Sequence, residues 1–195
     1  MKKLILIFSL LISFNISAKS SFDLEINNLS IGDSLLKEFS RTQIKNEIKR
    51  NLDFYSTYEL DHTFVEVFFY SKTNKYEYVS FYVKPNDPHY KIHGLSGIKM
   101  YQDKIEACLG YLDKQVNLFS TYKNLTQYET FEGEHPIDPS GKSYVKQTFF
   151  ETKEGEIIEL QCADYDPSVQ KNGDNGDYYG IYIMTPEVED WFGGA

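Results

Sequence analysis

Only two cysteines, Cys108 and Cys162, occur in the chain, and the patterns around them predict how a helix meets a sheet. Apolar residues recur at helical spacing from residue 103 to residue 122, and Cys108 lies on that apolar face. From residue 156 to residue 163 the side chains alternate as in a strand, and Cys162 shares a face with Leu160. Both sulfur atoms therefore point to one helix–sheet interface, which predicts a disulfide; two buried free thiols are the alternative.

Residues 1–18 have the pattern of an export signal. Two lysines precede an apolar run at 4–12, which is about half of the roughly 20 residues that a membrane span needs. Small residues follow the run and predict cleavage after Ala18 or after Ser20. No cysteine lies near the cut, so we expect no lipid anchor. The mature part, 19–195, is therefore expected to be a soluble periplasmic or secreted bacterial protein, in a compartment where disulfides form.

The mature chain is acidic and rich in aromatic residues. It carries 18 basic and 29 acidic residues once the two lysines of the signal are removed, a formal net charge of −11. This charge disfavours nucleic acid and anionic lipid as partners. It keeps the protein soluble, and it is also compatible with a basic protein partner or a cation. The full sequence has 16 Tyr and 14 Phe, and all but two of these Phe lie in the mature part; they predict a sheet with half-buried aromatic faces, and a platform for sugars or peptides is the alternative.

Alternating segments joined by short turns predict antiparallel strands, interrupted by helices. The expected strands are 22–26, 63–70, 76–83, 89–93, 144–151, 156–163 and 178–184. The expected helices are a short one opened by Gly32 and Asp33, a second from the capping box Ser40–Gln43 to about Arg50, a long one at 103–122 and a closing one at 186–191. Gly94 and Gly97 predict a sharp turn after the 89–93 strand.

This order predicts an α+β fold, in which a short helix-turn-helix and one long amphipathic helix pack on an antiparallel sheet. The chain is long enough for a single domain at 19–195, or for two similar lobes that share a core.

The stretch LSIGDSLL at 29–36 resembles the opening I-S-I-G-D-S-L-L of an uncharacterised family of small exported bacterial proteins. The likeness continues through the helix of Cys108 and the strand of Cys162. The layout is more remotely similar to outer-membrane assembly lipoproteins of the SmpA/OmlA type and to the β-lactamase inhibitor protein fold. The remote similarity implies a binding role and no catalysis, although this chain lacks the lipid-anchoring cysteine of those lipoproteins.

Gly32, Asp33, Ser34 and Leu35 also spell the GDSL signature of serine esterases, in which the serine is the nucleophile. That chemistry needs a base within hydrogen-bond reach of the hydroxyl group, and donors for the oxyanion. The Asp-x-x-His that supplies the base in those enzymes does not occur in this sequence. We therefore interpret the motif as structural, with a turn at Gly32 and a helix cap at Asp33.

No metal site or cofactor is expected. His89 and His93 are four residues apart, which in a strand separates them by about 13 Å, too far for one ion. The acidic loop from Asp164 to Asp177 has oxygen ligands of the kind that calcium prefers, but it lacks the EF-hand spacing and is interpreted as solvated.

These observations predict an exported, non-catalytic protein that binds a protein or another component of the cell envelope. Two alternatives remain open: an esterase that uses Ser34, and a small-ligand binder on a tyrosine-rich sheet face.

Overall fold

The computed structural model describes residues 24–193, except 57–61, 103, 137 and 169–175. Its helices are a 3-10 helix Leu35–Lys37, α1 Arg41–Ser56, α2 Ile105–Phe119 and α3 Pro186–Trp191. Its strands are β1 Val65–Tyr70, β2 Tyr78–Val83, β3 Ile92–Met100, β4 Leu125–Glu134, β5 Tyr144–Thr152, β6 Ile157–Asp164 and β7 Tyr178–Met184. The fold is α+β, as predicted. The predicted export signal and its cleavage site lie outside the described residues.

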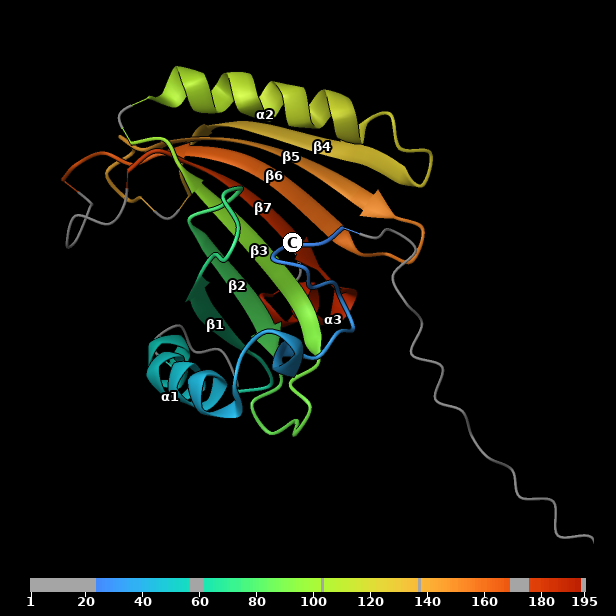
Figure 1. Ribbon diagram of the computed structural model, residues 1–195. Coiled ribbons are helices and arrows are strands. Elements are labelled where there is room, and N and C mark those ends of the chain that lie inside the picture. Colours follow the sequence, from blue (N-terminus) through green and yellow to red (C-terminus); the bar gives the residue numbers. More distant parts are fainter. Residues whose placement is uncertain (1–23, 57–61, 103, 137, 169–175, 194–195) are drawn as a thin grey trace, which may run out of the picture.

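The seven strands form one antiparallel sheet in the order β1-β2-β3-β7-β6-β5-β4. The first part of the chain supplies α1 and β1 to β3, and the second supplies α2 and β4 to β7. The two parts meet where β3 pairs with β7, and the sheet twists strongly between its ends (Figure 1). Its two edge strands, β1 and β4, therefore belong to different parts of the chain.

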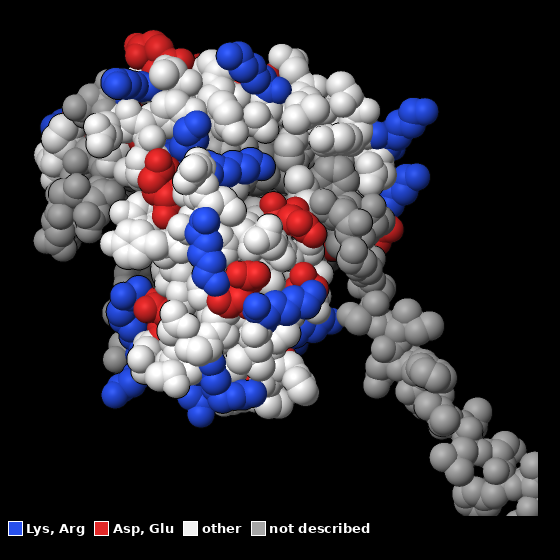
Figure 2. Space-filling view, in the orientation of Figure 1, with Lys and Arg blue, Asp and Glu red and all other residues white. Residues whose placement is uncertain are grey.

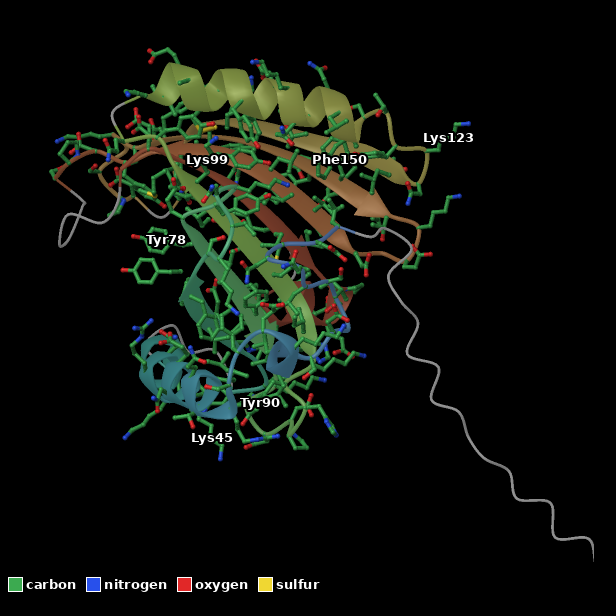
Figure 3. The ribbon with its side chains drawn as sticks, viewed as in Figure 1. Lys45, Tyr78, Tyr90, Lys99, Lys123 and Phe150 are labelled. Carbon is green, nitrogen blue, oxygen red and sulfur yellow. A yellow bond between two sulfur atoms is a disulfide. The ribbon has the colours of Figure 1, made fainter. Side chains whose placement is uncertain are left out.

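One face of the sheet, which we call the helix face, packs against α1, α2 and the N-terminal segment. A row of paired residues on this face is almost fully buried; it reads Val67, Phe81, Leu95, Ile183, Ile158 and Phe150. Phe39 stacks on Phe69 of β1 with ring centroids 3.8 Å apart, and Phe119 of α2 meets Phe150 at 5.7 Å. Figure 3 shows Phe150 between α2 and the sheet. Apolar burial of this extent is the main source of stability in a domain of this size.

A disulfide fixes α2 on this face, and a capping box defines the start of α1. Cys108 of α2 and Cys162 of β6 form a disulfide with Cα atoms 6.0 Å apart, which confirms the predicted pairing. At the start of α1, the Gln43 amide N–H bonds to Ser40 Oγ at 3.3 Å, and the Ser40 amide N–H bonds to Gln43 Oε1 at 3.0 Å. These reciprocal bonds form the capping box expected from the sequence.

The prediction of a short strand at 89–93 followed by a turn is wrong. Both Gly94 and Gly97 lie inside the longer strand β3. A Cβ atom at Gly94 would lie 2.8 Å from the Tyr82 ring, and one at Gly97 would lie 2.9 Å from the Tyr76 ring. The glycines therefore admit tyrosine rings that lie flat on the sheet, and they do not break the strand.

Three further elements differ from the sequence expectation. The edge strand β4 was not predicted, because nearly all of its side chains are exposed and its sequence has no apolar alternation. The strand expected at 22–26 begins outside the described residues, and Ile26 forms only an isolated bridge with Leu29. The helix expected at 103–122 is observed as the shorter α2.

Candidate functional site: the open face of the sheet

The face of the sheet opposite α1 and α2, which we call the open face, is built from every second residue of the strands. Paired residues of neighbouring strands point to the same side, so the register identifies its rows. One row crosses the whole sheet and reads Tyr70, Tyr78, Ile98, Gly180, Gln161, Gln147 and Phe131. The next row reads Phe68, Ser80, Ser96, Tyr182, Glu159, Phe149 and Glu129. Aromatic side chains therefore occupy both ends of the open face, and polar ones its centre.

The aromatic side chains at the two ends are exposed. Tyr70 is 79% exposed and Tyr78 38%, and their rings lie 5.2 Å apart at the β1 end. Figure 3 shows Tyr78 standing away from the sheet. At the β4 end, Phe131 is 40% exposed, and Tyr128 lies 6.0 Å from Phe149 between ring centroids. Clusters of exposed aromatic side chains on one face commonly mark an interaction surface.

A hydrogen-bond network fills the centre of the open face. Gln161 Nε2 donates to Tyr178 Oη at 2.7 Å and to Tyr182 Oη at 3.1 Å. Gln147 Nε2 donates to Glu159 Oε1 at 2.6 Å and to Gln161 Oε1 at 3.1 Å. Because each amide orients the next, the network fixes the positions of the two tyrosine hydroxyl groups.

The glycine at the centre of the sheet shapes this network. A Cβ atom at Gly180 would lie 2.6 Å from the Tyr182 ring and 3.0 Å from its hydroxyl oxygen. The Tyr182 ring can therefore lie along β7 and bring its hydroxyl group to Gln161, because Gly180 has no side chain.

Burial changes the acid–base properties of the open face. Desolvation raises the pKa of Glu159 to about 7, the Gln147 amide opposes this shift, and the charge of Glu189 adds to it. Burial, together with neighbouring tyrosines, also raises the pKa of Tyr178 well above its ordinary value. The Tyr178 hydroxyl group therefore stays protonated at neutral pH, as does the hydroxyl group of an ordinary tyrosine.

The closing helix α3 covers one end of the open face. Its buried Val188 packs with Phe64, Tyr82 and Met184 in a small separate cluster, which Trp191 flanks. The Phe64 ring meets the Trp191 ring edge-on at 5.8 Å. The helix α3 leaves uncovered both the β1 end, where Tyr70 and Tyr78 are exposed, and the β4 end, where Phe131 is exposed.

A pocket of about 440 Å³ opens on this uncovered part. Its lining consists of Glu66, Phe68, Tyr70, Tyr78, Ser96, Ile98, Met100, Tyr178 and Tyr182. Glu66 is only 8% exposed and accepts a hydrogen bond from Ser80 Oγ, which lies 2.7 Å from Ser96 Oγ. A second hollow of about 460 Å³ lies on the α1 side of β1 and shares Phe68, Tyr70 and Tyr78 with the first. Pockets of this size suit a small ligand or a single side chain of a partner.

Glu66 was not identified from the sequence. The signal that could have found it is a lone carboxylate between apolar residues in the strand sequence VEVFFY. Such a residue needs a polar contact on the pleated face to which it points. Its contact, Ser80, is on the neighbouring strand and follows only from the register.

The hydroxyl group of Ser34 is engaged by the backbone. It donates to the main-chain oxygen of His89 and accepts the Leu36 amide N–H at 3.2 Å, as a cap of the 3-10 helix. The sequence predicted Asp33 as the helix cap, but the observed cap is Ser34. The Asp33 carboxylate accepts the Ser30 amide N–H at 3.2 Å and pairs with Lys37.

The other two residues of the GDSL motif have backbone and packing roles. Gly32 has a φ of 86°, a conformation that favours glycine, and Leu35 is fully buried in the core. All four residues of the motif therefore take part in the turn that leads into α1.

The histidines and acidic groups of the described residues form no group of three that could hold a metal ion. His135 Nε2 lies 3.0 Å from Tyr165 Oη, and His93 Nδ1 lies 3.4 Å from Glu187. The central part of the acidic loop from Asp164 to Asp177, considered above for calcium, lies outside the described residues.

Basic and acidic side chains are interspersed on the side of the molecule that Figure 2 presents, and they form no field of a single sign there. None of the helices in the described ranges combines the length and the apolar character that crossing a bilayer requires. Comparison of the chain with protein-family models, with curated proteins and with solved structures finds no match.

Proposed function

We propose that this chain is an exported binding protein, and that it holds a protein partner of the cell envelope on the open face of its sheet. The observation that carries the proposal is the gathering of exposed aromatic side chains on the face that α1 and α2 leave uncovered and that α3 covers only at one end. Aromatic residues contribute disproportionately to protein interfaces, because they bury a large area at a small entropic cost.

The spacing of the two aromatic ends favours an extended protein segment. They lie on the two edge strands, β1 and β4, which are separated by six strand spacings. At about 4.8 Å per spacing, the ends are up to roughly 29 Å apart along the sheet. A single small molecule does not reach across this distance, whereas a loop or strand of a partner does.

Export is supported by the leader-like residues 1–18 and by the disulfide. A disulfide between Cys108 and Cys162 persists in an oxidising compartment and is rare in the cytosol. The mass of the intact protein recovered from cells tests export directly. We expect a chain that begins at residue 19 or residue 21, and recovery of the complete chain of 195 residues would contradict export.

Site-directed photo-crosslinking in cells tests the binding surface. A benzoyl-phenylalanine is placed at Phe131 or at Tyr78 on the open face, and, as a matched control, at Lys114 on the exposed side of α2. We expect one and the same partner to crosslink from both open-face positions and not from Lys114. Equal crosslinking from all three positions, or none from the open face, would contradict the proposal.

A small ligand in the 440 Å³ pocket is a second candidate, favoured by the enclosure of that pocket by four tyrosines. It differs from the first in its footprint. A small ligand would crosslink to a benzoyl-phenylalanine at Tyr78 but not to one at Phe131, which lies on the edge strand at the other end of the sheet.

A further inference from the structure

The pocket on the open face has one charged group, and that group is an acid. Its nine lining residues include the carboxylate of Glu66 and no Lys, Arg or His. Glu66 is 8% exposed and lies in β1, where its neighbours Val65 and Val67 point to the helix face. A carboxylate on the wall of the pocket attracts a cation that enters the pocket.

The hydrogen bond to Glu66 holds the carboxylate in a defined orientation. Ser80 Oγ donates to Glu66 Oε1, and the hydroxyl group of Ser96 lies 2.7 Å from that of Ser80. A carboxylate accepts several hydrogen bonds at once, so the bond from Ser80 is compatible with further N–H donors from a ligand. The pocket therefore presents an oriented acceptor at its wall.

Aromatic rings form most of the remaining wall. The Tyr70 and Tyr78 rings lie 5.2 Å apart with an interplanar angle of 40°, and Tyr178 and Tyr182 line the side toward β7. The faces of such rings attract cations within about 6 Å, by roughly 0.5 to 2 kcal/mol for each contact. A carboxylate together with several rings is the combination that recognises an ammonium or guanidinium group attached to an apolar stem.

We infer that this pocket receives the side chain of a lysine or arginine residue on the protein partner, with Glu66 as the counter-charge. The inference rests on the proposed function and names the chemistry of the contact. The pocket lies at the β1 end of the row that crosses the sheet, so a segment laid along the row places one of its side chains there. The acidic chain, with 29 Asp and Glu against 20 Lys and Arg, also steers a basic segment toward it.

The test is a titration of the ¹⁵N-labelled mature protein with each of two tripeptides, in which changes of the amide chemical shifts report binding. The first is acetyl-Gly-Lys-Gly-amide; in the second, norleucine replaces lysine, which keeps the aliphatic stem and removes the charge. We expect the lysine peptide to shift the amides of Ser80 and Ser96 and to bind at least tenfold more tightly than the norleucine peptide. Equal binding of the two peptides would overturn the inference.

Two variants with the same change in net charge complete the test. Glu66→Gln keeps an acceptor oxygen for Ser80 and removes the counter-charge. We therefore expect it to lower the affinity for the lysine peptide at least tenfold. Glu132→Gln removes a charge on the exposed edge strand β4 and is expected to change the affinity less than twofold. Unchanged affinity in Glu66→Gln, with the native spectrum retained, would overturn the role of Glu66.

Tetramethylammonium serves as the probe for a free cationic small molecule. It has no N–H to donate, so we expect it to bind more weakly than the lysine peptide. Tighter binding of tetramethylammonium would overturn the assignment to a partner side chain.

Photo-crosslinking separates this inference from the proposed function. If Glu66→Gln still crosslinks from Phe131 and the tripeptides do not distinguish lysine from norleucine, the binding face stands and the cation site fails. If no partner crosslinks from either aromatic end, the proposed function itself fails, whatever the tripeptides do.

Discussion

The two faces of the sheet are made from the same strands but have opposite characters. On the helix face, Phe81, Leu95 and Ile158 are fully buried beneath the helices, and a disulfide fixes one of these helices, α2, to the sheet. On the open face, Tyr70 and Tyr78 stand in solvent, and the polar groups between the two ends bond to one another. The fold is therefore held mainly from one side, which leaves the other free to carry a binding surface.

The difference between the faces can be measured with a pair of neighbouring phenylalanines. Phe81 of β2 is fully buried near Phe39 and Phe69, whereas Phe68 of β1 is 39% exposed on the open face. We expect Phe81→Ala to lower the free energy of unfolding by about 3 to 5 kcal/mol, because it leaves a cavity. Phe68→Ala should cost less than about 1 kcal/mol. Denaturant unfolding measures both, and equal losses would show that the open face also holds the fold.

The disulfide gives the next largest expected effect. The bond closes a loop between cysteines 54 residues apart and joins α2 to β6. Replacing both cysteines by alanine should lower the free energy of unfolding by about 2 to 4 kcal/mol, chiefly because the unfolded chain gains freedom.

The same double variant sharpens the comparison of the two faces. Because the bond lies on the helix face, affinity for the lysine tripeptide should be unchanged in the folded variant at low temperature. A parallel loss of binding would mean that the two faces are coupled through the sheet.

The helix face was largely predictable from the sequence. Alternation places Cys162 and Leu160 on one side of β6, and the helical period places Cys108 on the side of α2 that meets them. Burial imposes a period on a sequence, so the strands and the helix that face the core can be recognised. The same logic fails for β3, where the glycines resemble a turn until the tyrosine rings that cover them are seen.

The open face was predictable only as a class of surface. The number of tyrosines indicated an aromatic sheet face, but no local pattern indicated which residues meet there. Glu66 meets Ser80, and Ser80 meets Ser96, because of the register between β1, β2 and β3, and Gln147 meets Glu159 across a hairpin. Such contacts join positions that no local pattern connects, so they require the folded structure.

The half-buried carboxylate Glu159 makes the open face sensitive to pH. Its pKa is raised from 4.5 to about 7, mainly by desolvation, with the charge of Glu189 as an added cause. Between these two values the unfolded chain releases a proton that the folded chain keeps, so the free energy of unfolding falls as the pH rises. The loss is complete above about pH 7 and amounts to at most roughly 3 kcal/mol.

Glu159→Gln measures this effect, because the amide cannot ionise. The stability difference between the variant and the native protein should be flat below about pH 4.5, should grow in favour of the variant up to about pH 7, and should then stay constant. Thermal or denaturant unfolding at five pH values is sufficient. A pH-independent difference would show that Glu159 ionises freely and that the network does not bury it.

The smallest effect on stability should accompany a large effect on binding. Tyr70 is 79% exposed at the β1 edge, and Leu118 of α2 is 45% exposed on the helix side. Replacing either by alanine removes little buried surface and should change the free energy of unfolding by less than about 0.5 kcal/mol. Only Tyr70→Ala should lower the yield of the crosslink from Phe131, at the opposite edge of the sheet, by tenfold or more. A loss transmitted across six strand spacings requires one partner that spans the open face, whereas an unchanged yield would mean that the two aromatic ends act separately.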